Sequence, residues 1–116
     1  MQLPKKKLPA SFYKIPTGKE PVREWLKSLK RDDCRAVGMD IAHVEFGWPL
    51  GKPLCDSLGD GLWEVRSHIS DGRIARVLFC TRNNRMVLLH GFIKKTQKIQ
   101  KKDRDLALRR KKEIEQ

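Results

Sequence analysis

The spacing of hydrophobic residues changes once along the chain, and this change limits the possible folds more than any other feature. Between Val22 and Val44, apolar residues recur every three or four positions, which is the spacing of amphipathic helices. They form two sets: Val22, Trp25, Leu26 and Leu29, and then Cys34, Val37, Ile41 and Val44. The short connection between the sets predicts two antiparallel helices in a helical hairpin. Asp32 or Asp33 is expected to cap the second helix.

Beyond Gly61, apolar residues recur at every second position, as they do in strands. This alternation predicts three strands, at residues 62–69, 73–80 and 85–93. A shorter first strand is predicted at residues 11–15, and the glycines and prolines of residues 48–61 predict a loop. A three-stranded meander packed on a helical hairpin is an α+β domain.

The two ends of the chain are expected to differ from this middle part. Residues 1–9 are expected to form a flexible basic arm, because Pro4 and Pro9 discourage regular structure. From Lys94 onward the chain holds ten basic residues, and Asp103 is expected to cap a basic C-terminal helix over residues 103–116. With 116 residues, the chain is expected to form a single domain.

The charge of the chain indicates an anionic partner. Lys and Arg number 26 against 14 Asp and Glu, which gives a formal net charge of +12. Such an excess most often belongs to proteins that bind nucleic acid, and sometimes to proteins that bind acidic proteins. The alternative is a basic surface that is simply solvated.

Several other classes of protein are excluded by what the sequence lacks. No apolar run is long enough to span a bilayer, so we expect no membrane partner. Three widely spaced cysteines without a CxxC motif argue against a disulfide framework and a zinc ribbon, and they indicate a reducing, cytoplasmic location. The histidines have no ligand spacing and no phosphate-binding glycine motif occurs, so neither a metal nor a small-molecule cofactor is expected.

The predicted strands also contain basic residues that can gather on one face. Arg66 lies on the polar side of its strand, and Arg76 interrupts an apolar strand. A buried arginine without a partner is costly, so we expect Arg76 on a solvent-facing or anion-binding face, near Lys94 and Lys95. Phosphate recognition needs such a group of cations. In the alternative, Arg66 pairs with Glu64 or a helix carboxylate and Arg76 covers an apolar flank.

Three segments of the predicted strands have a recognisable pattern: LWEVR at residues 62–66, RIARVLF at 73–79 and LLHGFIKKTQK at 88–98. They resemble the RelE/ParE toxin superfamily, and most closely its HigB-like, phage-derived branch. The resemblance extends over residues 12–113 and implies a RelE-like fold. In that fold an N-terminal strand and a helical hairpin pack on a mainly antiparallel β-meander, followed by a C-terminal basic helix.

The resemblance also implies an activity. Toxins of this superfamily typically enter the ribosomal A site and cleave mRNA there, and a small antitoxin, in this branch commonly a helix-turn-helix protein, neutralises them. We therefore expect the toxin of a type II toxin–antitoxin system, an mRNA endoribonuclease that depends on the ribosome and inhibits translation. Two alternatives stay open: a ParE-like inhibitor of DNA gyrase without nuclease activity, and a non-catalytic basic module that binds nucleic acid.

Single positions acquire roles from the same resemblance. Arg66, Arg76 and Lys94 match the basic positions of RelE-like nucleases, and we expect them to stabilise charge on the phosphate. The residues expected to bind RNA are Arg73, Lys95, Lys98, Lys101 and Lys102. The reaction, an attack of the RNA 2′-hydroxyl on the phosphate, needs no metal.

The residue that transfers the proton is less well defined by the pattern. His68 is preferred, because alternation places it on the face of Arg66 and Glu64. His90 is the second choice, since alternation places it opposite Leu89 and among apolar neighbours, and Glu64 is the third. The nucleases often have a tyrosine near the C-terminus, but this chain has a single tyrosine, near its N-terminus.

Overall fold

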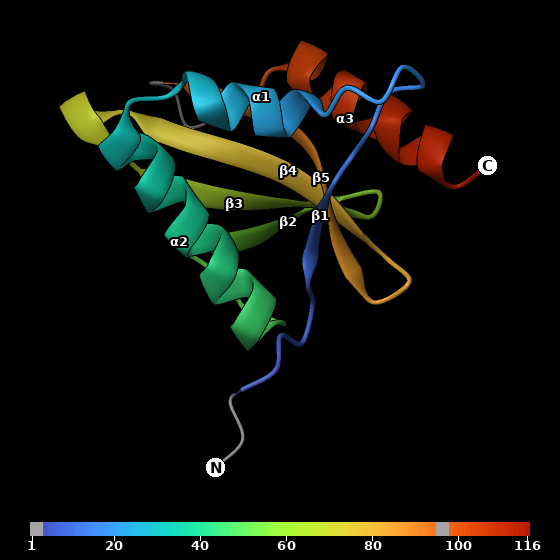
Figure 1. The fold of residues 1–116 in the computed structure, drawn as a ribbon, viewed down its shortest axis with the longest axis horizontal. Helices are drawn as coiled ribbons and strands as arrows, with labels where there is room; N and C mark the ends of the chain where they lie inside the picture. The colour runs from blue at the N-terminus through green and yellow to red at the C-terminus, as the bar shows by residue number, and fades with distance from the viewer. Residues whose placement is uncertain (1–3, 95–97) are drawn as a thin grey trace.

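Three α-helices and one five-stranded sheet make up residues 4–94 and 98–116, the part of the chain that the computed structural model describes (Figure 1). In chain order the elements are β1 (Ala10–Phe12), α1 (Pro21–Ser28), α2 (Arg31–Gly47), β2 (Cys55–Gly59), β3 (Leu62–His68), the short 3-10 helix η1 (Ser70–Gly72), β4 (Ile74–Arg82), β5 (Arg85–Lys94) and α3 (Lys101–Ile114). The α+β fold class predicted from the sequence is confirmed, and the arrangement is consistent with a RelE-like fold.

The strands are ordered β1-β5-β4-β3-β2 across the sheet. β1 runs parallel to β5, where Phe12 pairs with Leu88, and the other neighbouring pairs are antiparallel. β3, β4 and β5 are the meander that the period of two predicts, because consecutive strands joined by tight turns pair with each other. The first strand therefore lies at the edge of the sheet, beside the last strand of the chain.

Helices pack on both faces of the sheet and create two hydrophobic cores. Val37 of α2 belongs to the core that includes Val77, whereas Ala107 of α3 belongs to the core that includes Leu78. Neighbouring residues of β4 thus belong to different cores, as expected for side chains that alternate between the two faces of a sheet. Burial on both sides explains why β4 is almost continuously apolar. No helix within the described residues is long and apolar enough to cross a membrane.

One strand lies where the sequence predicted a loop. β2 pairs with β3, and the turn between them uses left-handed backbone at Gly59, Asp60 and Gly61, whose φ angles are 82°, 54° and 76°. The glycines adopt this conformation without steric cost. Within β2 only Cys55 is buried, so no apolar alternation marks the strand in the sequence. Its pairing with β3 is what makes this segment a strand.

The segment that precedes β1 contacts α2, and the C-terminal helix packs on the sheet. Lys6 Nζ lies 3.1 Å from Glu45 Oε2, and the buried Leu8 donates its N–H to the Glu45 carbonyl oxygen at 2.9 Å. Part of the arm predicted at residues 1–9 is thus in contact with α2. The C-terminal helix begins at Lys101, two residues before its predicted start, and ends at Ile114.

Candidate functional site

A bulge in β5 determines which face of the sheet His90 occupies. β4 and β5 pair at Leu78↔His90 and next at Phe79↔Leu88, so Leu89 is an extra residue in β5. Leu88 belongs to the core under α1 and α2, and Leu89 belongs to the core under α3. Because of the bulge, His90 also lies on the α3 side, where it contacts that helix. The expectation that His90 lies on the face opposite Leu89 is therefore wrong.

The strand register brings the predicted basic residues of the meander to the same face. Two cross-strand rows contain them: Arg66–Arg76–Phe92 and His68–Ile74–Lys94. Directly opposite residues in neighbouring strands point to the same side of a sheet. Arg66, Arg76, Lys94 and His68 thus all belong to the α3 side.

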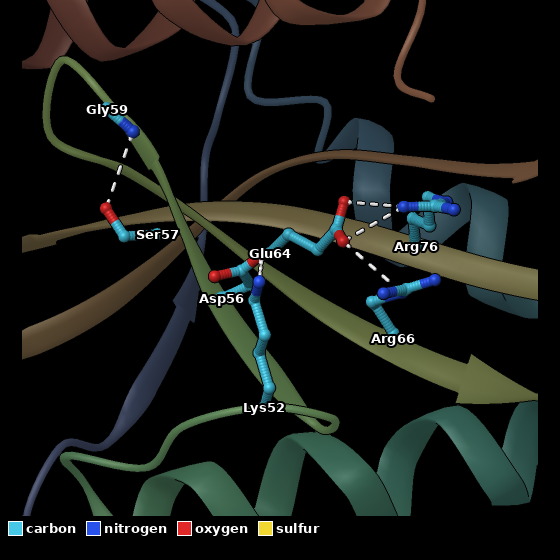
Figure 2. A network of polar contacts seen from close by, with 7 residues as sticks. All are labelled: Lys52, Asp56, Ser57, Gly59, Glu64, Arg66 and Arg76. Carbon is cyan, nitrogen blue, oxygen red and sulfur yellow. Dashed lines mark hydrogen bonds and ion pairs between the residues drawn. The ribbon is translucent and has the colours of Figure 1, made fainter. Parts of the chain in front are cut away.

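Arg76 is buried against Glu64 instead of facing solvent. Its Nη1 donates to both carboxylate oxygens of Glu64, at 2.9 and 3.0 Å, and Arg76 and Glu64 are 1% and 2% exposed. Arg66 Nε lies 3.5 Å from Glu64 Oε1, and the Arg66 side chain is 26% exposed. Figure 2 shows the Glu64 carboxylate with the two guanidinium groups beside it. The expectation that Arg76 faces solvent is wrong, because Glu64 offsets the cost of burying its charge. Only Arg66 of this pair offers positive charge to solvent.

α3 supplies a carboxylate to the same face. Asp103 Oδ1 lies 2.8 Å from His90 Nε2, and Asp103 Oδ2 lies 2.9 Å from Lys94 Nζ. Burial raises the pKa of the Asp103 carboxyl, but hydrogen bonds with His90 and Lys94 lower it by more, so its pKa is below the usual value. Phe92 stacks on His90, with ring centroids 5.2 Å apart. The imidazole is therefore held at one edge by a charged partner and on one face by an aromatic ring.

Asp103 is the site residue that the sequence pattern did not reveal. It was expected to cap the last helix, but α3 begins at Lys101 with Gln100 as its N-cap residue. Asp103 therefore lies in the first turn of the helix. There it is 7% exposed and faces β5. The signal available in the sequence is one acidic residue within a strongly basic segment. Its partners depend on how α3 packs on the sheet.

Arg73 links the turn between β3 and β4 to α2 through an ion pair. Its Nη2 lies 3.1 Å from Asp33 Oδ2, and Ser70 donates its backbone N–H and its hydroxyl to the same carboxylate at 3.0 and 2.9 Å. The bond from the Ser70 backbone is the largest cause that lowers the pKa of Asp33. Asp33, one of the two expected caps of α2, makes these contacts and no capping hydrogen bond. Arg73 thus has a structural partner.

The other residues expected to bind RNA lie around the start of α3. Lys98, Lys101 and Lys102 are exposed, and Lys101 Nζ lies 2.8 Å from Asp105 Oδ2. They are close in sequence to Asp103, which contacts His90. Lys95 lies outside the described residues.

Two of the three cysteines are unsuited to nucleophilic chemistry. Cys55 and Cys80 are buried, and burial raises the pKa of each thiol to about 11. Neither forms much thiolate near neutral pH, and the thiolate is the reactive form. Among residues 4–94 and 98–116, no three His, Cys, Asp or Glu side chains are grouped closely enough to hold a metal ion.

Comparison with known proteins assigns the chain to a family. No curated protein matches it. The family model described as phage-derived protein Gp49-like (DUF891) matches residues 24–112, from within α1 almost to the end of α3. The match includes the whole face formed by β3, β4, β5 and the start of α3. The chain therefore belongs to the family of phage-derived Gp49-like proteins.

Proposed function

We propose that this protein is the toxin of a type II toxin–antitoxin system and that it cleaves mRNA on the ribosome. The most direct support is the contact network of His90, Asp103 and Lys94, on the same face as the partly exposed Arg66. Cleavage of a phosphodiester needs a proton-transfer group and positive charge close together. The resemblance to RelE/ParE toxins, the phage-derived family and the net charge of +12 support the same function.

The proposed reaction is an attack of an RNA 2′-hydroxyl on the adjacent phosphorus. The P–O bond to the 5′-oxygen breaks, which leaves a 2′,3′-cyclic phosphate and a 5′-hydroxyl. His90 takes the proton of the 2′-hydroxyl, and Asp103 orients the ring and stabilises the imidazolium. Arg66 neutralises the charge that develops on the phosphorane oxygens, whereas the buried Lys94 Nζ holds the Asp103 carboxylate in place. The leaving 5′-oxygen takes a proton from water.

Burial gives Arg76 an indirect role in this proposal. Its side chain cannot reach a phosphate, but it contacts both oxygens of Glu64. Glu64 in turn lies 3.5 Å from the Arg66 guanidinium. Arg76 is therefore a positioning residue, which acts on RNA through Glu64 and Arg66.

His90 replaces His68 as the proton-transfer residue of the proposal. His68 is exposed, and within the described part of the chain it has no hydrogen-bond or ion-pair partner that would orient its ring. His90 has Asp103 at 2.8 Å. A catalytic base works best when a neighbouring group holds it in one orientation.

The exposed lysines around the start of α3 supply affinity for RNA. Lys98, Lys101 and Lys102 bind phosphates of mRNA and ribosomal RNA without regard to sequence, so binding weakens steeply with salt. The partners in this proposal are the ribosome, mRNA and a neutralising antitoxin of the helix-turn-helix type, all in the cytoplasm.

Cleavage mapping on a defined mRNA, with and without purified ribosomes, tests the proposal. Wild type is compared with His90→Ala, Lys94→Ala and Arg66→Ala. The control is His43→Ala, an exposed histidine of α2, which packs on the opposite face of the sheet. We expect ribosome-dependent cuts by wild type and by His43→Ala, and a rate reduced about a hundredfold or more in His90→Ala.

Each other result has a defined meaning. Cuts without ribosomes would make the protein a free ribonuclease. Absence of cuts by folded wild-type protein would overturn nuclease function. An assay of DNA supercoiling by gyrase and a salt titration of RNA and DNA binding would then separate the two alternatives, a gyrase inhibitor and a non-catalytic binding module.

A further inference from the structure

A small cavity opens at the edge of β3, beyond the point where β2 stops pairing with it. The two strands pair as far as Cys55↔Val65. Past that point the Arg66 N–H donates to the Leu54 carbonyl oxygen at 2.9 Å, so the chain that precedes β2 borders the strand. The cavity has a volume of about 140 Å³. Its lining residues are Asp40 of α2, Pro53, Leu54, Arg66 and His68.

The lining combines an apolar surface with polar groups that have no protein partner. Pro53 and Leu54 supply the hydrocarbon part. Among the residues that the structure describes, neither the Asp40 carboxylate nor the His68 ring has a hydrogen-bond or ion-pair partner. Asp40 is half-buried and His68 is exposed, so both polar groups are available to a ligand that enters the cavity.

We propose that this cavity binds one base of the RNA substrate, with Asp40 accepting hydrogen bonds from the base and guanine preferred. A base is flat and apolar on its faces and polar at its edges, which matches an apolar lining with polar groups. Unstacked RNA bases commonly stack on histidine rings, and His68 provides such a ring at the cavity. An ionised carboxylate only accepts hydrogen bonds. Guanine presents two adjacent N–H donors on its Watson–Crick edge, whereas uracil presents one between two acceptors.

Arg66 connects this cavity to the reaction face. It lines the cavity, and its Nε lies 3.5 Å from Glu64 Oε1 on the α3 side of the sheet. A nucleotide whose phosphate contacts Arg66 can therefore place its base against Asp40. The inference rests on the proposed function in taking RNA as the ligand, and its first test does not require cleavage.

Binding of single nucleotides is the first test. Guanosine 3′-monophosphate and uridine 3′-monophosphate are titrated into the intact protein, and NMR shifts of the Leu54 methyl groups and the His68 ring are followed. We expect guanosine 3′-monophosphate to shift these signals at lower concentration, and Asp40→Asn to weaken its binding about tenfold. Asp32→Asn is the matched control, because Asp32 is exposed on the same helix and does not line the cavity. Equal binding of the two nucleotides, or no effect of Asp40→Asn, would overturn the inference.

A second pair of variants tests the stacking surface independently of Asp40. His68→Phe retains an aromatic face, whereas His68→Ala removes it. We expect His68→Phe to bind guanosine 3′-monophosphate like wild type and His68→Ala to bind it several-fold more weakly. Equal affinities for the two variants would show that the base does not stack on this residue and would contradict the assigned geometry.

The cleavage pattern then separates the inference from the function on which it rests. Cuts by wild type are expected to lie beside guanine, and Asp40→Asn is expected to lose this preference. Cuts whose base preference is the same in both proteins would overturn the inference and leave the nuclease function standing. If wild type cuts no RNA, the nuclease function fails, and the nucleotide titration still decides what the cavity binds.

Discussion

His90 and Asp103 come from different elements, β5 and α3, and His90 Nε2 lies 2.8 Å from Asp103 Oδ1. The contact depends on the docking of α3. Arg104, the next residue of that helix, donates from Nη1 to the Leu58 carbonyl oxygen at 2.7 Å and from Nη2 to Asp60 at 2.6 Å. The turn between β2 and β3 therefore anchors the helix that orients the histidine.

Asp103→Asn is expected to lower the rate of RNA cleavage about a hundredfold. The amide keeps the size of the side chain but loses the charge that orients His90 and offsets Lys94. Single-turnover cleavage on ribosomes measures the rate, and circular dichroism confirms folding. Asp105→Asn is the control, because Asp105 is exposed and pairs with the exposed Lys101. A wild-type rate in Asp103→Asn would show that His90 needs no orienting carboxylate.

Stability is expected to fall in acid because the pKa values of Asp33 and Asp103 are lowered in the folded protein. The unfolded chain then binds more protons than the folded one, so stability increases with pH in this range. The stabilisation by these two carboxylates is complete above the ordinary Asp pKa of about 4. It disappears as the pH falls through their lower pKa values in the folded protein. Urea midpoints measured from about pH 6 to about pH 2 test this. Asp33→Asn should make the urea midpoint depend less steeply on pH, and an unchanged dependence would contradict the prediction.

Arg76→Leu is expected to destabilise the fold by about 3 kcal/mol, because it leaves the buried Glu64 carboxylate without its closest partner. The double variant Glu64→Leu/Arg76→Leu removes both charges and should recover most of the loss. Arg66→Leu, at the partly exposed partner, should cost about 1 kcal/mol or less. Urea unfolding gives all three values. Equal losses for Arg66→Leu and Arg76→Leu would contradict this assignment of the buried pair.

Gly91→Ala is expected to lower the melting temperature through a clash in the core. A Cβ at Gly91 would lie 2.3 Å from Cε3 and 2.6 Å from Cζ3 of Trp25 in α1. Overpacking of this kind costs about 1–3 kcal/mol. At Gly38 in α2 a Cβ would meet nothing within 4 Å, so Gly38→Ala should stabilise the helix by about 1 kcal/mol or less. A thermal melt of both variants checks the contrast, and a stabilised Gly91→Ala would contradict the close packing.

Alkylation is expected to distinguish the three cysteines. Burial raises the pKa of Cys55 and Cys80 to about 11, whereas Cys34 is partly exposed. Iodoacetamide at about pH 8 should therefore modify Cys34 in the folded protein, and the other two only after denaturation. Peptide mass spectrometry measures each site. Rapid modification of Cys80 in the folded state would show that β4 is more open than its burial indicates.

Local patterns in the sequence were sufficient to predict the two N-terminal helices and the three central strands. Their periods of 3.6 and two residues are set by backbone geometry and by the faces that contact the cores. The same reasoning did not find β2, because a single buried residue, Cys55, gives no period. It also placed His90 on the wrong face, since alternation cannot reveal the extra residue at Leu89.

The sequence by itself determined the secondary structure of the meander and of the two N-terminal helices, the α+β class and the basic character of the surface. The tertiary structure alone decided the partners of the charges. Asp33 and Asp103 were predicted as caps, yet they pair with Arg73 and with His90 and Lys94. Such partners are far apart in sequence, and the energy of a charge depends on burial and on neighbours that only packing brings within a few ångström. Local patterns report on neighbours along the chain, whereas the site consists of neighbours in space.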